Sequence, residues 1–441
     1  MVLKSQDYRI RFEKYGTIRI AKMSKFFVTG GKKLEGKIKV SGNKNAALKL
    51  IPAALLADSP STFTNVPKIS DVDVMVEIVE KLGAKVEYKD HVLTIDPRTL
   101  TSFDPDPDLS SKFRASVVLA APLLAKFGKA VVTPPGGDQI GDRLLDTHFS
   151  MMQKMGVTME RKDGRFFLEW KKKKSSDIFL EEASVTATEM GLMMASAIDG
   201  SLTIQDTAAE PHVTDLSNYL KRMGAKIDGI GTNTLTISGG KLKGTEHKVS
   251  PDHIEGGTFA VASAITGGKV EIEDFRGQDY PMILNYLSYM GVNFRQNANS
   301  LTVLPSELAA SRRKFQTRPW PGFPTDLMSP FIVLATQTKG TVLCHDWMYE
   351  WRMFFVDDLI SMGANIFIAD PHRVIVSGPT PLISDRLFCK DIRAGISVIL
   401  AALTAQGRSE IENIEVVERG YEKIDDRLKA LGAEIWKKDS E

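Results

Sequence analysis

The sequence KNAALKLIPAALLA, residues 44–57, has a polar opening followed by a run of apolar and small residues. Related stretches recur along the chain and open at Lys44, Arg114, Val185, Glu255, Thr325 and Arg393. Successive openings lie 70, 71, 70, 70 and 68 residues apart. A glycine that follows Leu or Met recurs in phase, at Gly83, Gly156, Gly224, Gly291, Gly363 and Gly432. A fixed period of this kind predicts one supersecondary unit copied six times.

The first unit indicates what is repeated. Its pattern predicts a buried helix, a strand, an amphipathic helix and two strands, over residues 44–57, 61–66, 69–82, 84–88 and 91–95. We expect Ser70 and Asp71 to cap the amphipathic helix and Gly83 to end it. Six apolar helices must be buried against neighbours. The sequence therefore predicts an α/β fold with three units per domain, sheets outside and apolar helices in the centre.

Length and composition limit the classes of function. A chain of 441 residues suits two domains. The net charge of +2 argues against nucleic acid as a main partner, and no window approaches the roughly 18 apolar residues of a membrane span. Cys344 and Cys389 lie in apolar contexts that predict buried thiols and a reducing compartment. We expect Met23 to be the biological start, or residues 1–23 to form a loose extension, and Lys171–Lys174 to be a solvated loop edge.

Three of the six repeated openings carry a cation, at Lys44, Arg114 and Arg393. A repeat with a purely structural role would place Ser, Thr, Asp or Asn at a helix start, because these residues cap it. A cation there opposes the helix dipole unless an anion shares the space. The alternative is that these three are surface cations with local partners. The same alternative applies to three arginines in loop-like segments, Arg143, Arg352 and Arg419. Three cations at equivalent positions favour a cleft for a multiply anionic small molecule.

Two further segments depart from a plain repeat. The loop TPPGGDQIGDR, residues 133–143, is rich in glycine and carries Asp138 in its middle. As a phosphate-binding motif it is weak, because it lacks a Walker lysine, and an ordinary exposed hairpin is the alternative. Asp326, in FPTD, opens an apolar helix where other copies hold cations. Stabilisation of the helix dipole accounts for a single acid at that place.

The chain resembles the UDP-N-acetylglucosamine 1-carboxyvinyltransferase family of enolpyruvyl transferases. The resemblance spans about residues 26–435 and rests on motifs in a fixed order, among them SGNKNAAL, KFRASVVLAAPLLAKFG, PGGDQIGDRLLDTH, EPHVTDLSNYL, FPTDL, EWRMF and DIRAG. It implies two domains, each an inside-out α/β barrel of three βαβαββ units, with the active site in the cleft between them. The implied domains are residues 44–252 and residues 24–43 with 253–441, so that the N-terminal strands join the C-terminal half.

The resemblance also implies roles for individual residues. Those matched to phosphoenolpyruvate are Lys44, Asn45, Arg143, Arg393 and Arg419. Those matched to the uridine nucleotide sugar are Arg114, Arg143, Leu144, Leu145, Asp146, Thr147, Ser184, Val185, Asp326 and Met348. The catalytic set is Lys44, Asp138, Asp326 and Arg419. Asp326 would accept the proton of the sugar 3-hydroxyl, and Asp138 stands where most members carry a cysteine that acts as general acid.

The aspartate at position 138 changes the expected chemistry. To donate a proton at neutral pH, its carboxyl must be held protonated by desolvation or by a bound phosphate in the closed complex. A carboxylate is also a poorer nucleophile than a thiolate, which predicts resistance to the epoxide fosfomycin. Smaller departures are Thr186 in place of glycine, which would crowd the nucleotide, Val416 near a common histidine, and Asp142 beside Arg143.

The implied activity is transfer of the enolpyruvyl group to the 3-hydroxyl of UDP-N-acetylglucosamine with release of phosphate, in peptidoglycan synthesis. We expect a cytoplasmic monomer with no metal and no cofactor, since the seven histidines show no ligand spacing. One alternative is a 3-phosphoshikimate 1-carboxyvinyltransferase on the same fold. Another is a nucleotide-sugar-binding protein that has lost catalysis, which Asp138 favours and the intact cationic set disfavours.

Overall fold

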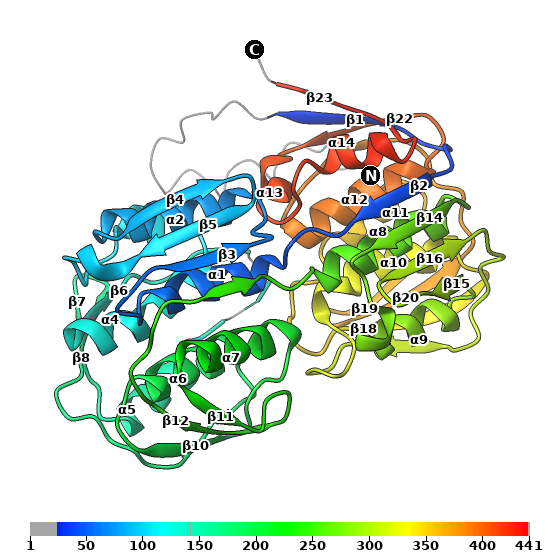
Figure 1. The fold of residues 1–441 in the computed structure, drawn as a ribbon. Coiled ribbons are helices and arrows are strands. Elements are labelled where there is room, and N and C mark those ends of the chain that lie inside the picture. Colours follow the sequence, from blue (N-terminus) through cyan, green and yellow to red (C-terminus); the bar gives the residue numbers. More distant parts are fainter. Residues whose placement is uncertain (1–23, 139, 142, 440–441) are drawn as a thin grey trace.

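The computed structural model describes residues 24–138, 140–141 and 143–439, and its ribbon has two lobes (Figure 1). The expectations for residues 1–23 and for Asp142 lie outside this part of the chain. Two separate clusters of buried apolar residues form the cores. One, in the first lobe, runs from Ala46 to Val249. The other, in the second lobe, takes residues from Phe26 to Val40 and from Ile254 to Ile435.

The first unit has the predicted order of elements. Its helices are α1 (Lys44–Ala54) and α2 (Ser70–Lys81), and its strands are β3 (Ser61–Thr64), β4 (Lys85–Lys89) and β5 (Val92–Asp96). Helix α1 is buried along nearly its whole length, because Ala and Leu occupy most of its faces. Helix α2 alternates buried apolar and exposed charged residues. Strand β5 pairs antiparallel with both β3 and β4.

The same order recurs in five more units. The apolar helices are α4 (Ala120–Phe127), α6 (Val185–Ser196), α8 (His253–Ile265), α10 (Met328–Gln337) and α12 (Ile392–Thr404). The second helices are α5 (Asp146–Lys154), α7 (Pro211–Met223), α9 (Pro281–Tyr289), α11 (Val356–Ser361) and α14 (Ile424–Ala430). The strands that follow the apolar helices are β6 (Lys129–Val132), β10 (Ser201–Gln205), β14 (Lys269–Glu273), β18 (Gly340–His345) and β22 (Arg408–Glu412).

The closing strands of these units complete six sheets in the described residues. They are β7 (Thr158–Lys162), β8 (Arg165–Glu169), β11 (Lys226–Asp228), β12 (Thr234–Ser238), β15 (Asn293–Gln296), β16 (Ser300–Leu304), β19 (Ile366–Asp370), β20 (Arg373–Gly378) and β23 (Glu434–Lys438). Short parallel strands extend five of the sheets, among them β9 (Ile178–Phe179), β13 (Glu246–Lys248), β17 (Lys314–Gln316) and β21 (Arg386–Phe388). The sixfold repeat predicted from the sequence is therefore confirmed at the level of the sheets.

The N-terminal strands belong to the second lobe. Strand β1 (Lys25–Thr29) pairs antiparallel with β22 and β23. Strand β2 (Glu35–Lys39) pairs in parallel with β14. Figure 1 shows both, in blue, among the orange and green elements of that lobe. The chain then enters the first lobe at α1 and returns before α8.

The structure corrects the expectation about capping. Cap residues precede two of the three helices that open with a cation: Asn43 accepts from the Ala46 amide at the start of α1, and Asp391 accepts from two amides at the start of α12. Lys44 and Arg393 therefore follow a cap and do not replace it, whereas Phe113, before Arg114, makes no side-chain cap. Helix α8 begins at His253, two residues before the predicted opening, because Asp252 caps it. Residues 114–119 form a 3₁₀ turn that leads into α4.

Other expectations from the sequence can also be compared with the structure. Cys344 and Cys389 are free and buried, as predicted. The run Lys171–Lys174 is exposed. Among the described residues, no helix has the length and apolar character needed to cross a bilayer. Within the same residues, no group of three or more His, Cys, Asp or Glu side chains is arranged to hold a metal ion.

Candidate active site

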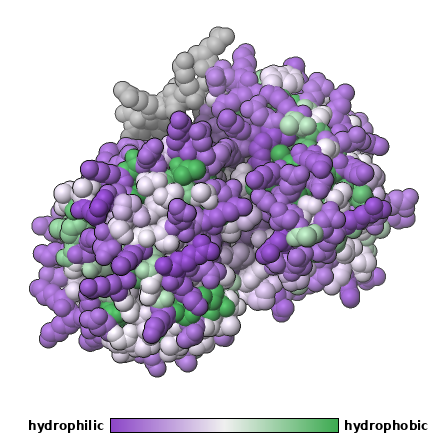
Figure 2. Space-filling model, viewed as in Figure 1, coloured by the Kyte–Doolittle hydropathy of each residue, from purple (hydrophilic) through white to green (hydrophobic). Residues whose placement is uncertain are grey.

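A cavity of about 510 Å³ lies between the two lobes, and residues of both lobes line it. The space-filling view is mostly hydrophilic and shows a recess between the lobes (Figure 2). The loop of residues 133–143 reaches the second lobe, where the Ile140 carbonyl accepts a hydrogen bond from the Trp351 amide at 3.1 Å. The described part of this loop therefore bridges the cleft.

One wall of the cavity is a chain of alternating charges. The Lys44 ammonium lies 2.8 Å from the carboxylate of Asp71. Arg419, from the other lobe, donates to Asp71 at 2.9 Å and to Asp138 at 3.0 Å. Burial alone would raise the pKa of Asp71, but Lys44 and Arg419 outweigh burial and lower it. Asp71 therefore holds two of the predicted phosphoenolpyruvate residues beside Asp138.

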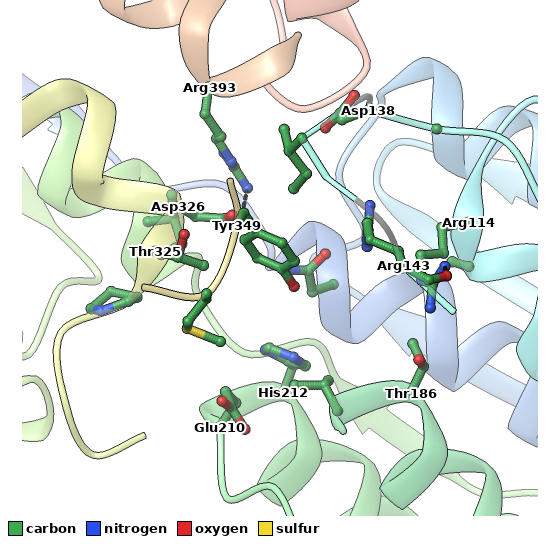
Figure 3. A pocket seen from close by; sticks show the side chains of 18 of the residues that line it. Arg114, Asp138, Arg143, Thr186, Glu210, His212, Thr325, Asp326, Tyr349 and Arg393 are labelled. Atoms are coloured by element: carbon green, nitrogen blue, oxygen red, sulfur yellow. Dashed lines mark hydrogen bonds and ion pairs between the residues drawn. The ribbon is translucent and has the colours of Figure 1, made fainter. Parts of the chain in front are cut away.

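The opposite wall holds Asp326, at the start of the 3₁₀ turn before α10. One carboxylate oxygen accepts from Arg393 at 2.9 Å and the other from Arg352 at 3.1 Å. Burial alone would raise the pKa of Asp326, but Arg393 and Arg352 hold it well below its usual range. Figure 3 shows Asp326 and Arg393 on one side of the cavity and Asp138 across from them.

Two arginines lie on the side of the first lobe. The Arg114 guanidinium donates to the carbonyls of Arg143 and Leu144, which fixes the end of the loop. The guanidinium of Arg143 lies 5.8 Å from the centre of the Tyr349 ring, a cation–π contact. Burial, followed by repulsion from Arg143, lowers the pKa of Arg114 to about 10. Two like charges in one cavity are the arrangement that an anion stabilises.

Most of the predicted site residues line this cavity. They are Lys44, Asn45, Arg114, Asp138, Arg143, Leu144, Ser184, Val185, Asp326, Met348, Arg393 and Arg419. Leu145, Asp146 and Thr147 do not line it. Helix α5 begins at Asp146, and the Thr147 hydroxyl donates to Glu182 at 3.3 Å.

For several residues of the cavity, the sequence did not predict the role that the structure shows. Asp71 was expected only to cap α2, yet the helix has no side-chain cap and Asp71 pairs with cations. Arg352 is 2% exposed and pairs with Asp326, so the interpretation as a surface arginine is wrong for it. The motif EPHVTD contains two further lining residues, Glu210 and His212, which start α7.

A buried polar cluster around Glu189 adjoins the cavity, because two of its members, Lys49 and His212, line it. The Lys49 ammonium and His212 Nε2 lie 3.7 and 3.9 Å from the two oxygens of Glu189. Both Glu189 oxygens lack hydrogen-bond partners in the described residues. Burial, with a smaller contribution from Glu210, raises the pKa of Glu189 to about 8, although Lys49 opposes the shift. The same burial lowers the pKa of His212 well below its usual value.

The comparisons with known proteins agree on one family. A sequence model of a protein family, described as EPSP synthase (3-phosphoshikimate 1-carboxyvinyltransferase), matches residues 28–428. A UDP-N-acetylglucosamine 1-carboxyvinyltransferase of Treponema denticola is 45% identical over 424 residues, covering 94% of this chain and 99% of the relative. A protein of the same name from Borrelia garinii subsp. bavariensis is 43% identical over 423 residues, with the same two coverages.

Solved structures show the same fold. The enolpyruvyl transferase NikO from Streptomyces tendae superposes with a TM-score of 0.87 at 24% identity, covering 96% of this chain and 100% of that chain. An EPSP synthase from Acinetobacter baumannii superposes with a TM-score of 0.70 at 19% identity, covering 94% and 100%. At these identities the likeness concerns the fold alone.

Proposed function

Since this chain belongs to the UDP-N-acetylglucosamine 1-carboxyvinyltransferase family of enolpyruvyl transferases, we propose that it transfers the enolpyruvyl group of phosphoenolpyruvate to the 3-hydroxyl of UDP-N-acetylglucosamine. Phosphate is released, and the product enters peptidoglycan synthesis and cell-wall biogenesis. One observation carries the proposal: the cavity between the lobes interleaves the cations Lys44, Arg393 and Arg419 with the carboxylates Asp138 and Asp326. Such a set can bind a donor that carries a phosphate and a carboxylate, and it can also transfer protons.

The reaction needs an acid and a base in one cleft. Protonation of C3 of the enolpyruvyl group makes C2 electrophilic, and the sugar 3-hydroxyl oxygen then bonds to C2 as it loses its proton. Loss of a proton from C3 and departure of phosphate from C2 restore the double bond in the product. Each proton transfer by a positioned side chain contributes about 10²–10⁴-fold to the rate.

The cationic side chains would bind the donor. We assign the phosphate and carboxylate of phosphoenolpyruvate to Lys44, Arg143, Arg393 and Arg419, with Asn45 beside them. Lys44 and Arg419 share the carboxylate of Asp71, which orients both without neutralising the cluster. Buried cations fixed in this way stabilise the charge that builds up on the leaving phosphate.

The acceptor would lie along the first lobe and reach across the cleft to Asp326. We assign the nucleotide sugar to Arg114, Arg143, Leu144, Ser184, Val185, Asp326 and Met348. We also keep the assignment of Leu145, Asp146 and Thr147 to the nucleotide sugar, because they lie in the matched segment. Their backbone groups would make the contacts. Asp326 accepts the proton of the 3-hydroxyl. Asp138 supplies the proton to C3 after it has separated from Arg419 and taken up a proton from solvent.

We also propose a two-domain architecture for the family fold. The first domain comprises residues 44–252, and the second comprises residues 24–43 and 253–441. Each domain is an inside-out α/β barrel of three βαβαββ units around its apolar helices. Two separate clusters of buried residues and six sheets support this division.

We propose that the enzyme is a cytoplasmic monomer. The two free buried thiols suit a reducing environment, which supports the cytoplasmic location.

Release of phosphate from phosphoenolpyruvate tests the function. We expect release with UDP-N-acetylglucosamine and none with shikimate 3-phosphate. Release with shikimate 3-phosphate alone would favour the alternative activity. No release with either acceptor, together with retained binding of UDP-N-acetylglucosamine, would favour a binding protein without catalysis. The mass of the sugar nucleotide product identifies the transferred group in the positive case.

A further inference from the structure

Thr186 lines the cavity at the start of α6 and contacts a buried histidine. Its hydroxyl oxygen lies 2.7 Å from Nε2 of His148. His148 is fully buried, and its other ring nitrogen, Nδ1, has no hydrogen-bond partner in the described residues. In the part of the chain that the structure describes, Thr186 is therefore the hydrogen-bond partner of this ring.

The position of the ring proton follows from this geometry. Burial, and then the charge of Arg114, lower the pKa of His148 to about 3, so the imidazole is neutral and carries one N–H. A buried N–H without a partner is costlier than a buried lone pair without one. The hydrogen therefore resides on Nε2 and is donated to the Thr186 oxygen. The Thr186 hydroxyl keeps its own hydrogen for another acceptor.

The surroundings of that hydroxyl are rich in donors. Val185 and Thr186 are the first two residues of α6, and neither backbone N–H has a partner in the described residues. Figure 3 shows Thr186 on the same side of the cavity as Arg114 and Arg143. The two guanidinium groups repel each other. A hydroxyl hydrogen, two amides and two cations on one side of a cavity together match an anionic oxygen.

We infer that the Thr186 hydroxyl donates a hydrogen bond to a diphosphate oxygen of the acceptor substrate, with His148 as the positioning residue that sets its direction. The inference rests on the proposed function, because that function supplies a nucleoside diphosphate as the ligand. It also replaces the expectation from the sequence that Thr186 crowds the nucleotide. The two interpretations predict opposite effects of removing the side chain.

The test compares Thr186→Val, Thr186→Ser and Thr186→Gly with the unchanged protein. Calorimetry with UDP as the probe measures affinity without turnover. We expect Thr186→Val to weaken UDP binding about tenfold, which is the loss of one hydrogen bond to a charged group. Thr186→Ser keeps the hydroxyl and should bind within about twofold of the unchanged protein. Thr236→Val is the matched control, because the Thr236 hydroxyl, on β12, also has a side-chain partner, the hydroxyl of Thr203.

Steady-state kinetics adds a second readout. Thr186→Val should raise KM for UDP-N-acetylglucosamine about tenfold while KM for phosphoenolpyruvate stays the same. Unchanged UDP affinity in Thr186→Val, equal or tighter binding in Thr186→Gly, or no UDP binding by the unchanged protein would overturn the inference. Absence of phosphate release with UDP-N-acetylglucosamine, with UDP binding intact, would instead count against the proposed function.

His148→Phe tests the positioning role. Without the Nε2 donor, the Thr186 hydroxyl is free to turn, so UDP binding should weaken. The double variant with Thr186→Val should bind UDP no more weakly than Thr186→Val alone, because both changes act on one hydrogen bond. Additive losses would overturn the role assigned to His148. If His148→Phe does not fold, the Thr186 series still decides whether the hydroxyl binds the acceptor.

Discussion

Arg393 donates a hydrogen bond to Asp326 across 2.9 Å, so a side chain assigned to the donor substrate is paired with the side chain assigned as the base. Arg352 occupies the other oxygen of the same carboxylate. A carboxylate whose pKa is held low by two arginines is a weak base. If the bound donor draws Arg393 toward the phosphate or carboxylate of phosphoenolpyruvate, the basicity of Asp326 rises. With the proposed roles, the ion pair would couple donor binding to proton acceptance.

Asp326→Asn should lower kcat for phosphate release about 10²–10⁴-fold, because the amide cannot accept the proton of the 3-hydroxyl. The KM for phosphoenolpyruvate should change far less, since Arg393 stays in place. Asp279→Asn is the matched control, because that exposed carboxylate also pairs with an arginine, Arg276. Asp326→Asn that keeps more than a tenth of the normal kcat would contradict the role of Asp326 as base.

Asp71→Asn should destabilise the fold and weaken donor binding together. Lys44 and Arg419 would lose a shared buried partner, and breaking a buried pair costs about 3–5 kcal/mol. Because the pKa of Asp71 is lowered in the folded state, its ion pairs stabilise the fold fully at pH values above 3.8, the ordinary pKa of the group. That contribution is lost as pH falls through the folded pKa.

Denaturant unfolding at pH 7 and the KM for phosphoenolpyruvate measure the two effects of Asp71→Asn. Asp73→Asn is the matched control, since Asp73 lies in the same helix and forms an exposed pair with Lys68. A variant at Asp71 that matches this control in both stability and KM would show that the buried carboxylate does not hold Lys44 and Arg419.

The sequence predicted the repeated elements well, because each depends on local pattern. Helix α1 begins at Lys44 and α6 at Val185, as the apolar period indicated. The same local reasoning misread Asp71 as a cap. Its partner Arg419 lies 348 residues away in the sequence and belongs to the other lobe. No spacing along the chain encodes such a contact.

The buried members of the site were the hardest to predict. Glu189 sits within an apolar helix, and neither Lys49 nor His212 lies at a diagnostic spacing from it. Only the packing of α1, α6 and α7 brings the three together. The place of Asp138 in a matched motif predicted a role for it, but its partner Arg419 lies 281 residues away in the sequence, in the other lobe.

Fosfomycin should leave the unchanged protein unmodified. A carboxylate is a poor nucleophile toward an epoxide, and Asp138 is held by Arg419 at 3.0 Å. Asp138→Cys should gain the mass of one inhibitor molecule, because a thiol at this position would lie beside cations that favour the thiolate. Cys344 and Cys389 are buried and provide an internal control. Intact-protein mass spectrometry makes the comparison, and a mass gain at Asp138 in the unchanged protein would refute the expected resistance.

Glu189 should make the stability of the fold depend on pH. Burial raises its pKa from 4.5 to about 8, so the folded state holds the proton more tightly than the unfolded state. Stability is therefore greatest below pH 4.5 with respect to this group, and it falls as pH rises toward about 8, by up to about 1.4 kcal/mol per pH unit. Glu189→Gln, neutral throughout, should flatten this slope in denaturant unfolding, whereas the exposed control Glu160→Gln should keep it. Equal slopes in the two variants would mean that Lys49 keeps Glu189 ionised, as a buried ion pair, over the whole range.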